Sequence, residues 1–275
     1  MPFVPIEHFY SPYPVMDEIK RHDFSATLPE KIPGIDLNTV EQLNLLGKLE
    51  TFYKELPFKE KKTEGLRYYF DNNSFRYSDA IFLFLILRYL KPKKIIEAGS
   101  GFSSCITLDT NEFFFNNTMK CIFIEPYPRV LKSLIRKNDK SNCEIHESKL
   151  QKIPLGIFRQ LEENDVLFID STHISKFNSD VNYIIHAILP ELQKGVYIHF
   201  HDIVYPFEYK QERLSRGVAW NEQYILRSFL EYNSMFKIVL FNSYLERFYN
   251  EEVLVKFPLV HKAAGNSIWL KKTDV

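Results

Sequence analysis

The sequence predicts an α/β fold, with a mostly parallel sheet covered by helices on both faces. From Ser78 onward, short apolar runs typical of strands alternate with longer helical stretches. Hydrophobic residues make up 45% of the 275 residues, which is enough for one elaborated core. The strand-like runs are KIIEA (94–98), CIFIE (121–125), CEIHE (143–147), VLFID (166–170), VYIHFHD (196–202), FKIVLFN (236–242) and SIWLKK (267–272). They predict a seven-stranded sheet.

The chain is expected to divide into an N-terminal extension, residues 1–65, and a main domain, residues 66–275. The extension is rich in proline and contains one amphipathic helical pattern, Thr39 to Leu56, in which leucines recur at helical spacing. We expect the extension to cover a substrate site or to form a dimer contact. In the main domain, helices are expected over Ala80–Leu90 and Asn221–Tyr232, while residues 243–266 receive no assignment.

Composition and charge limit the classes of partner. The formal net charge is zero, so the basic surface typical of sequence-independent nucleic-acid binding is not expected. The most apolar run, Ala80–Leu90, is about half the roughly 20 residues that span a bilayer. Three cysteines at irregular spacing and a proline-containing N-terminus without a signal-peptide pattern favour a cytoplasmic protein, with no membrane and no nucleic-acid partner. A small molecule or sugar fits this composition better.

A glycine turn follows the first strand-like run of the main domain, in "KIIEAGSGFSS". Gly99 and Gly101 predict a turn at which backbone amides approach a ligand, and we expect Gly101 to need a positive φ angle. A nicotinamide-dependent oxidoreductase is one alternative, but its third glycine is replaced here by Ser104. Glu97, two residues before Gly99, suits a cationic ligand better than a pyrophosphate.

Several motifs in order resemble one family. The segments "NNSFRYSDA", "IIEAGSGFSS", "VLFIDSTHISKFNSD", "VYIHFHDI" and "WNEQYILRSFL" are similar to class I S-adenosylmethionine-dependent methyltransferases of the methyltransferase family 24 branch. The resemblance implies the Rossmann-like class I methyltransferase fold with S-adenosylmethionine as cofactor. It places Glu97 near the methionine amine, Glu125 at the ribose and Ser148 at the adenine. The full implied cofactor set is Tyr77, Asp79, Glu97, Gly99, Ser100, Gly101, Glu125, Pro126, Ser148 and Asp170.

The acceptor side is expected at the ends of two later strands. Strands that end in acidic residues at one sheet edge predict a shared crevice, although Glu97 and Glu125 can also be ordinary helix-capping or turn residues. The resemblance implies Asp170 and Asp202 as ligands of a divalent metal such as magnesium, yet Ile203 stands where related magnesium enzymes carry an amide. A metal-free alternative uses His173 or His201 as general base beside Asp170. His173 is preferred.

The loop after Asp202 supplies aromatic and cationic side chains. We expect Tyr205, Arg216 and Trp220 to contact the acceptor, with the loop acting as a lid. The alternative is that these aromatics pack against the extension or a second subunit. His199, deeper in its strand, is expected to be a core residue.

These observations predict an O-methyltransferase acting on a small molecule or sugar of bacterial secondary or glycan metabolism. A homo-oligomer is left open. The two alternatives are the oxidoreductase and a degenerate protein that binds the cofactor without methyl transfer.

Overall fold

The protein is described by a computed structural model, in which residues 3–274 are described. A seven-stranded sheet forms its centre, with the strand order β3-β2-β1-β4-β5-β7-β6, and only β7 runs antiparallel to its neighbours. This confirms the predicted α/β fold. The strands are β1 (Lys94–Ala98), β2 (Lys120–Ile124), β3 (Cys143–His146), β4 (Val166–Ile169), β5 (Tyr197–Phe200), β6 (Phe236–Phe241) and β7 (Ile268–Lys272).

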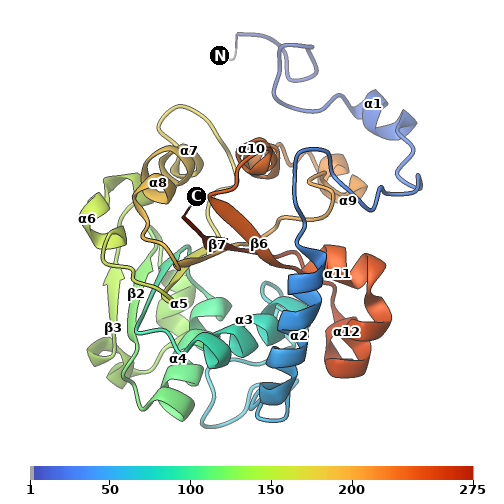
Figure 1. Cartoon of the computed structure of the whole chain (residues 1–275). Coiled ribbons are helices and arrows are strands. Elements are labelled where there is room, and N and C mark those ends of the chain that lie inside the picture. Colours follow the sequence, from blue (N-terminus) through green and yellow to red (C-terminus); the bar gives the residue numbers. More distant parts are fainter. Residues whose placement is uncertain (1–2, 275) are drawn as a thin grey trace.

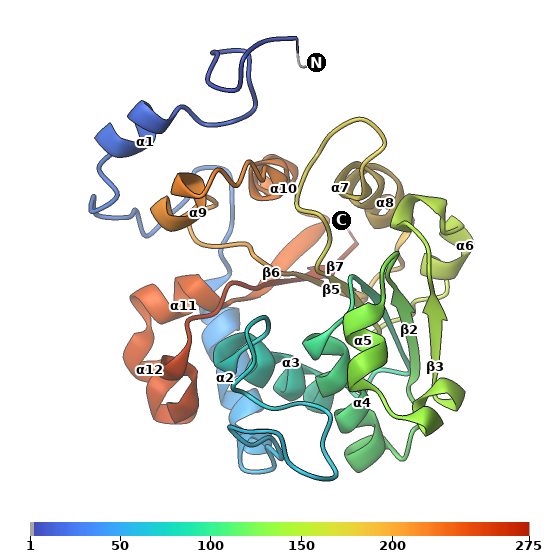
Figure 2. The same ribbon diagram turned by 180° about the vertical axis from the view of Figure 1, so that it is seen from behind.

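Helices cover both faces of the sheet (Figure 1), and the view from behind shows the same layers (Figure 2). Helices α3 and α4 lie on one face, with α2 beside α3, and α7, α8 and α10 lie on the other. The helices are α1 (Met16–Arg21), α2 (Thr39–Tyr53), α3 (Tyr77–Leu90), α4 (Phe102–Phe115), α5 (Arg129–Leu134), α6 (Leu155–Phe158), α7 (Asp180–Tyr183), α8 (Leu189–Glu191), α9 (Gln211–Ser215), α10 (Glu222–Leu230), α11 (Asn242–Phe248) and α12 (Asn250–Lys256).

The apolar run predicted to be a buried helix is confirmed as the core of α3. Its residues from Ala80 to Leu87 are at most 2% exposed, because the helix is apolar on every side and packs between α2, α4 and the sheet. Within residues 3–274, no helix combines the length and the apolar character needed to cross a membrane. Strands β1, β2, β4 and β5 are likewise short apolar runs, as expected of parallel strands covered on both faces.

The N-terminal extension has two structurally different parts. Helix α2 packs against α3 and β6, and its Leu46 and Leu49 belong to the main hydrophobic core. Helix α1 lies outside the helical layers and contacts α9 (Figure 1), whereas Ile32 and Leu37, between α1 and α2, belong to the core. The domain boundary near residue 65 therefore remains a prediction, since α2 shares its core with the domain that follows.

The strand order fixes where a ligand can bind. Strand β1 pairs with β2 on one side and with β4 on the other. Strands β2 and β3 therefore extend the sheet on one side of β1, and the strands from β4 onward extend it on the other side. In open α/β sheets, such a switch point leaves a crevice at the carboxyl ends of the strands. The loops after β1, β2 and β4 carry Gly99, Glu125 and Asp170 to this edge.

Candidate active site

A cavity of about 570 Å³ lies at this edge of the sheet. Gly99, Glu125 and Asp170 all line it, together with Pro126 from the predicted set. Its volume is within the range of sites that enclose a small molecule or cofactor. The cavity therefore brings together predicted cofactor residues from three separate loops.

Gly99 is the glycine that this turn requires. Its φ is +83°, and a Cβ atom at this position would lie 1.8 Å from the backbone oxygen of Asp170. The loops after β1 and β4 thus pass so closely that no side chain fits between them. The expectation of a positive φ at Gly101 is wrong: its φ is 179°, an added Cβ would only meet Val130 at 3.8 Å, and Gly101 does not line the cavity.

Glu125 is held at the cavity wall by backbone donors. Its Oε1 accepts a hydrogen bond from the Tyr127 amide at 2.8 Å, and its Oε2 accepts one from the Ser100 amide at 3.4 Å. Ser100 thus contributes its backbone to the wall. Oε2 thus faces the turn after β1 and Oε1 the loop after β2, and each oxygen has a further lone pair that could accept a hydrogen bond from a ligand hydroxyl.

Glu97 points away from the cavity toward the first turn of α4. Its Oε1 accepts hydrogen bonds from Ser103 Oγ at 2.5 Å and Ser104 Oγ at 2.9 Å, while its Oε2 has no partner among the described residues. Burial raises the pKa of Glu97 to about 8. The contacts of Glu97 therefore match its interpretation as a residue that stabilises the start of α4.

Tyr77 and Asp79 are not brought to the cavity. The Tyr77 hydroxyl donates to Glu60 at 3.0 Å, and its ring stacks on Phe70. Asp79 accepts hydrogen bonds from Ser267 Oγ at 2.6 Å and from the Asn266 amide at 3.0 Å, which ties α3 to β7. Both polar groups are thus used within the fold.

The wall that follows β3 differs from the prediction for Ser148. Ser148 itself does not line it, whereas Lys149, Leu150 and Gln151 do. Another wall comes from the segment before α7, including Thr172 and Phe177, and from Asp180 at the start of α7. Thr172 is fixed there because its Oγ1 donates to Asp180 Oδ1 at 2.6 Å.

A charged cluster adjoins the cavity through Asp170. His173 Nε2 lies 3.3 Å from Asp170 Oδ1 and 3.8 Å from Asp202 Oδ2, and its Nδ1 lies 2.7 Å from Glu222 Oε2. Burial alone would lower the pKa of His173, but the hydrogen bonds with Asp170 and Glu222 raise it to about 10. A pKa this high favours the protonated imidazole, which cannot accept a further proton, so we prefer Asp170 to His173 as the candidate base.

Asp170 is the cluster member that lines the strand-end cavity. Burial would raise its pKa, but the charges of His201 and His173 and the contact from His173 lower it to about 2. Glu222 was missed by the sequence reasoning, although it begins a predicted helix. It is 1% exposed, and burial raises its pKa against the opposing effect of His173.

The two strand histidines lie deeper in the fold. His199 confirms the expectation of a core residue, since it stacks on Phe168 at 3.8 Å and its Nε2 lies 2.9 Å from Ser267 Oγ. His201 is 6% exposed, with Nδ1 at 3.4 Å from the same hydroxyl. Burial opposes charge on His201, but Asp170, Asp202 and Asp79 raise its pKa. These carboxylates thus favour the protonated form of His201 more than burial alone would allow.

The residues proposed as metal ligands do not form a suitable donor set. Both carboxylate oxygens of Asp202 pair with the guanidinium of Arg213, one of them at 3.0 Å, and Asp170 faces His173. Within residues 3–274, no group of three or more His, Cys, Asp or Glu side chains is arranged to hold a metal ion. A metal ion bound here would compete with Arg213 and His173 for the carboxylate oxygens of Asp202 and Asp170.

Of the expected acceptor residues, only Trp220 lies beside the cluster. Its ring centroid is 4.3 Å from that of His173, and Arg213 lies over its ring at 4.6 Å. Tyr205 instead packs against Tyr244 and Phe248, and its hydroxyl donates to Pro29 O, so it holds the extension in place. Arg216 is exposed and does not line the strand-end cavity.

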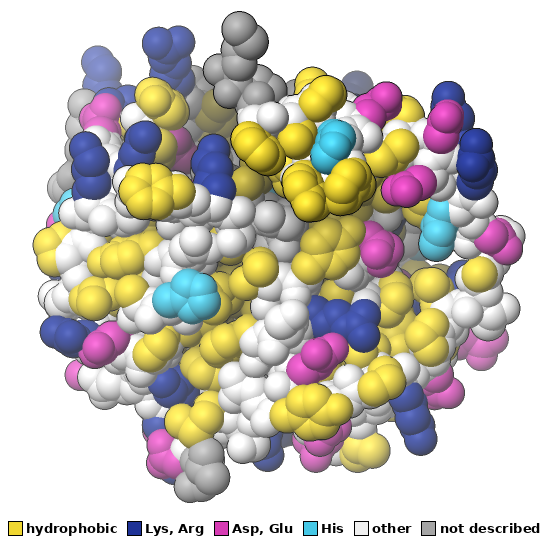
Figure 3. All heavy atoms as spheres, turned by 90° about the horizontal axis from the view of Figure 1, so that it is seen from above, with side chains coloured by type: hydrophobic (Ala, Val, Ile, Leu, Met, Phe, Trp, Pro, Cys, Tyr) yellow, Lys and Arg dark blue, Asp and Glu magenta, His cyan; other side chains and the backbone are white. Residues whose placement is uncertain are grey.

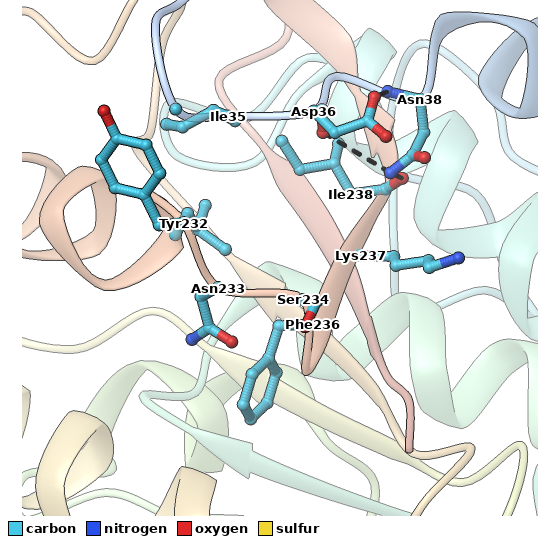
Figure 4. Close-up of a pocket in the computed structure, with 11 residues that line it drawn as sticks. Ile35, Asp36, Asn38, Tyr232, Asn233, Ser234, Phe236, Lys237 and Ile238 are labelled. Carbon is cyan, nitrogen blue, oxygen red and sulfur yellow. Dashed lines mark hydrogen bonds between the residues drawn. The ribbon is translucent and has the colours of Figure 1, made fainter. Parts of the chain in front are cut away.

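Another hollow, of about 310 Å³, lies between the extension and the start of β6 (Figure 4). Beside this hollow, the Asn38 amide donates to Asp36 Oδ1. The side-chain amide of Asn38 donates to the carbonyl oxygens of Asp36 and Ile238. None of the expected site residues lines it. We therefore place the active site at the strand-end cavity.

The comparisons with known proteins identify the family of the chain. Residues 96–203, from β1 to just past β5, match the family described as "Methyltransferase domain". A protein of Archaeoglobus fulgidus, described as an uncharacterized protein, is 34% identical over 167 residues, which is 58% of this chain and 74% of that protein. The chain belongs to this family, methyltransferase family 24 of the class I S-adenosylmethionine-dependent methyltransferases.

Two solved methyltransferase structures are partly similar to the chain, with TM-scores below 0.5. The O-methyltransferase TomG from Streptomyces achromogenes, involved in tomaymycin synthesis and solved in complex with SAM, has a TM-score of 0.47 and 13% identity over 87% of this chain and 92% of that one. A methyltransferase from Podospora anserina, solved with bound SAH, has a TM-score of 0.47 and 12% identity over 89% of this chain and 99% of that one. The assignment rests on the family match and the strand order, not on these similarities.

Proposed function

We propose that the protein transfers the methyl group of S-adenosylmethionine to a hydroxyl of a small-molecule acceptor. The observation that carries the proposal is the position of Asp170, which lines the cofactor cavity and also contacts the buried cluster of His173 and Glu222. The cofactor would lie between Gly99, Glu125 and Leu150, with its sulfonium end toward Asp170. An acceptor from bacterial secondary or glycan metabolism, and a cytoplasmic location, belong to this proposal.

The chemistry is an in-line displacement. A lone pair of the acceptor oxygen forms the new bond to the methyl carbon, and the electron pair of the breaking carbon–sulfur bond stays on sulfur, which leaves S-adenosylhomocysteine. The acceptor's proton becomes strongly acidic as the new bond forms, so a carboxylate with a low pKa is able to accept it. Asp170 fills this role, while His173 and Glu222 hold it in position. The protein's main contribution is alignment.

No step in this proposal uses a metal ion. Asp202, the other carboxylate considered as a ligand, is paired with Arg213 and serves to fix the loop after β5. The nicotinamide alternative loses its support because the family match is to methyltransferases.

The test uses the full chain, labelled S-adenosylmethionine and a panel of hydroxylated small molecules. Asp170→Asn should lower methyl transfer by about 10² to 10⁴, the usual range for loss of a general base, and should retain binding of S-adenosylhomocysteine. Asp36→Asn, in the separate hollow, is the matched control and should keep full activity. Cofactor binding without labelled product from any acceptor would instead support the degenerate binding protein.

A further inference from the structure

A cavity of about 530 Å³ lies between the loop after β5 and the helices α11 and α12. Val204 and Tyr205 line it from that loop, Ser243 and Leu254 from the helices, and Gly265 from the segment before β7. Both ribbon views show α11 and α12 below α9, at the end of the molecule away from β3 (Figures 1 and 2). The cavity shares no lining residue with the strand-end cavity, so the two are separate spaces.

Basic side chains reach this cavity from three segments. Lys210 comes from the loop after β5, Arg247 from α11 and His261 from the turn after α12. All three are exposed, and the guanidinium of Arg247 has no hydrogen-bond or ion-pair partner within residues 3–274. Lys210 Nζ donates to the neutral side chain of Asn266 at 3.2 Å, while His261 uses Nδ1 for the Pro258 carbonyl in its own turn. Donors on Lys210 and Arg247 therefore remain available to a ligand, and His261 adds one from Nε2 when it is protonated.

Positive charge prevails in this cavity, although the formal net charge of the chain is zero and side chains of both signs are spread over the face seen from above (Figure 3). Glu246 is the one acidic lining residue within the described chain. Its Oε1 accepts from Ser78 Oγ, and both of its carboxylate oxygens accept from the Gly265 amide at 3.0 Å. Burial also raises the pKa of Glu246 to about 7, which reduces the negative charge that opposes Lys210 and Arg247.

A hydroxyl and several apolar side chains complete the lining. Ser243 Oγ accepts a hydrogen bond from the Tyr205 amide at 2.8 Å, which leaves its own proton free to donate. Leu28, Leu254 and Val260 line the cavity beside these polar groups. The cavity thus combines hydrogen-bond donors with an apolar surface, as sites for small molecules commonly do.

We propose that this cavity binds a small molecule that carries a phosphate group on an apolar body. The phosphate would lie among Lys210, Arg247 and Ser243, because cationic donors make their strongest hydrogen bonds with anionic oxygens. A phosphate monoester offers three acceptor oxygens to these three donor groups, whereas a carboxylate offers two. The site is distinct from the cofactor cavity and does not depend on the proposed function.

Titration calorimetry of phenyl phosphate into the full chain at constant ionic strength tests the proposal. The wild type should bind one molecule per chain with a dissociation constant below about 1 mM, with or without S-adenosylhomocysteine. Arg247→Gln should weaken binding about tenfold or more, because a charge-assisted hydrogen bond is lost. Arg21→Gln is the matched control, since it removes the same charge from an exposed position on α1 that does not line the cavity.

A variant of opposite sign sharpens the test. Glu246→Gln removes the negative charge of the cavity and should strengthen binding about twofold or more. Lys210→Gln should weaken it, and replaces Arg247→Gln if circular dichroism shows that variant to be unfolded.

Four results would overturn the proposal. The first is no saturation of the wild type by phenyl phosphate up to about 10 mM. The second is equal binding by Arg247→Gln, Lys210→Gln and Arg21→Gln. The third is displacement of phenyl phosphate by S-adenosylhomocysteine, which would place it in the strand-end cavity. The fourth is equally tight binding of phenol or benzoate, which would show that the phosphate is not recognised.

Discussion

Nδ1 of His173 lies 2.7 Å from Oε2 of Glu222, and both side chains are buried. On its other side, the same imidazole contacts Asp170 and approaches Asp202. Trp220 covers the ring, and His201, just after β5, has a pKa raised by the neighbouring carboxylates. The contact between Glu222 and His173 thus controls the charge of the group that positions Asp170.

Replacing Glu222 with glutamine should therefore lower the pKa of His173 from its value of about 10, because one of the carboxylates that stabilise the imidazolium is removed. Histidine side-chain NMR between pH 5 and pH 11 measures this shift, and His173→Asn identifies the signal. Methyl transfer by Glu222→Gln should also change its pH dependence in the same direction. An unchanged titration of His173 would contradict the assigned contact.

Gly99 and Gly101 should respond differently to the same substitution. Gly99→Ala introduces a Cβ against the Asp170 backbone at positive φ, which should destabilise the protein by more than about 1 kcal/mol and abolish binding of S-adenosylhomocysteine. Gly101→Ala has room for the added atom and should keep the fold. Circular dichroism and calorimetry compare the two variants. Equal tolerance at both positions would show that the two loops are not packed as described.

The free energy of unfolding should fall with rising pH because of Glu97. The folded state keeps a proton on this carboxyl up to a pKa of about 8, whereas the unfolded chain releases it near 4.5. Between these values, the folded state binds the extra proton, so stability decreases as pH rises. Glu97→Gln does not titrate, so its stability relative to the wild type should increase across this window. Urea unfolding at several pH values measures the difference, and parallel curves would refute it.

Chelation should leave methyl transfer unchanged. Asp202 is neutralised by Arg213, so the wild type should be as active in EDTA as in added magnesium or manganese. The assay is transfer of labelled methyl to an acceptor found in the screen. Loss of activity in EDTA that only a metal restores would mean that Arg213 moves away from Asp202 in the active enzyme.

The sheet was predictable because its strands are short, apolar and separated by regular helical stretches. Glu125 and Asp170 could be placed at one cavity because parallel strands present their carboxyl ends at one edge. The pairing of Asp202 with Arg213 and of His173 with Glu222 could not be inferred, since each depends on how the loop after β5 folds back. For the same reason, Tyr205 was expected at the acceptor but packs beneath the extension.

Titration calorimetry with S-adenosylhomocysteine tests the central claim most directly, namely that the cavity between β1, β2 and β4 is the cofactor site. The wild type should bind one molecule per chain with a micromolar dissociation constant, and Glu125→Ala should bind at least about tenfold more weakly, a loss of about 1.4 kcal/mol. Asp36→Asn should bind as the wild type does. No heat with the wild type up to millimolar concentration, or binding of NADH in its place, would contradict the account.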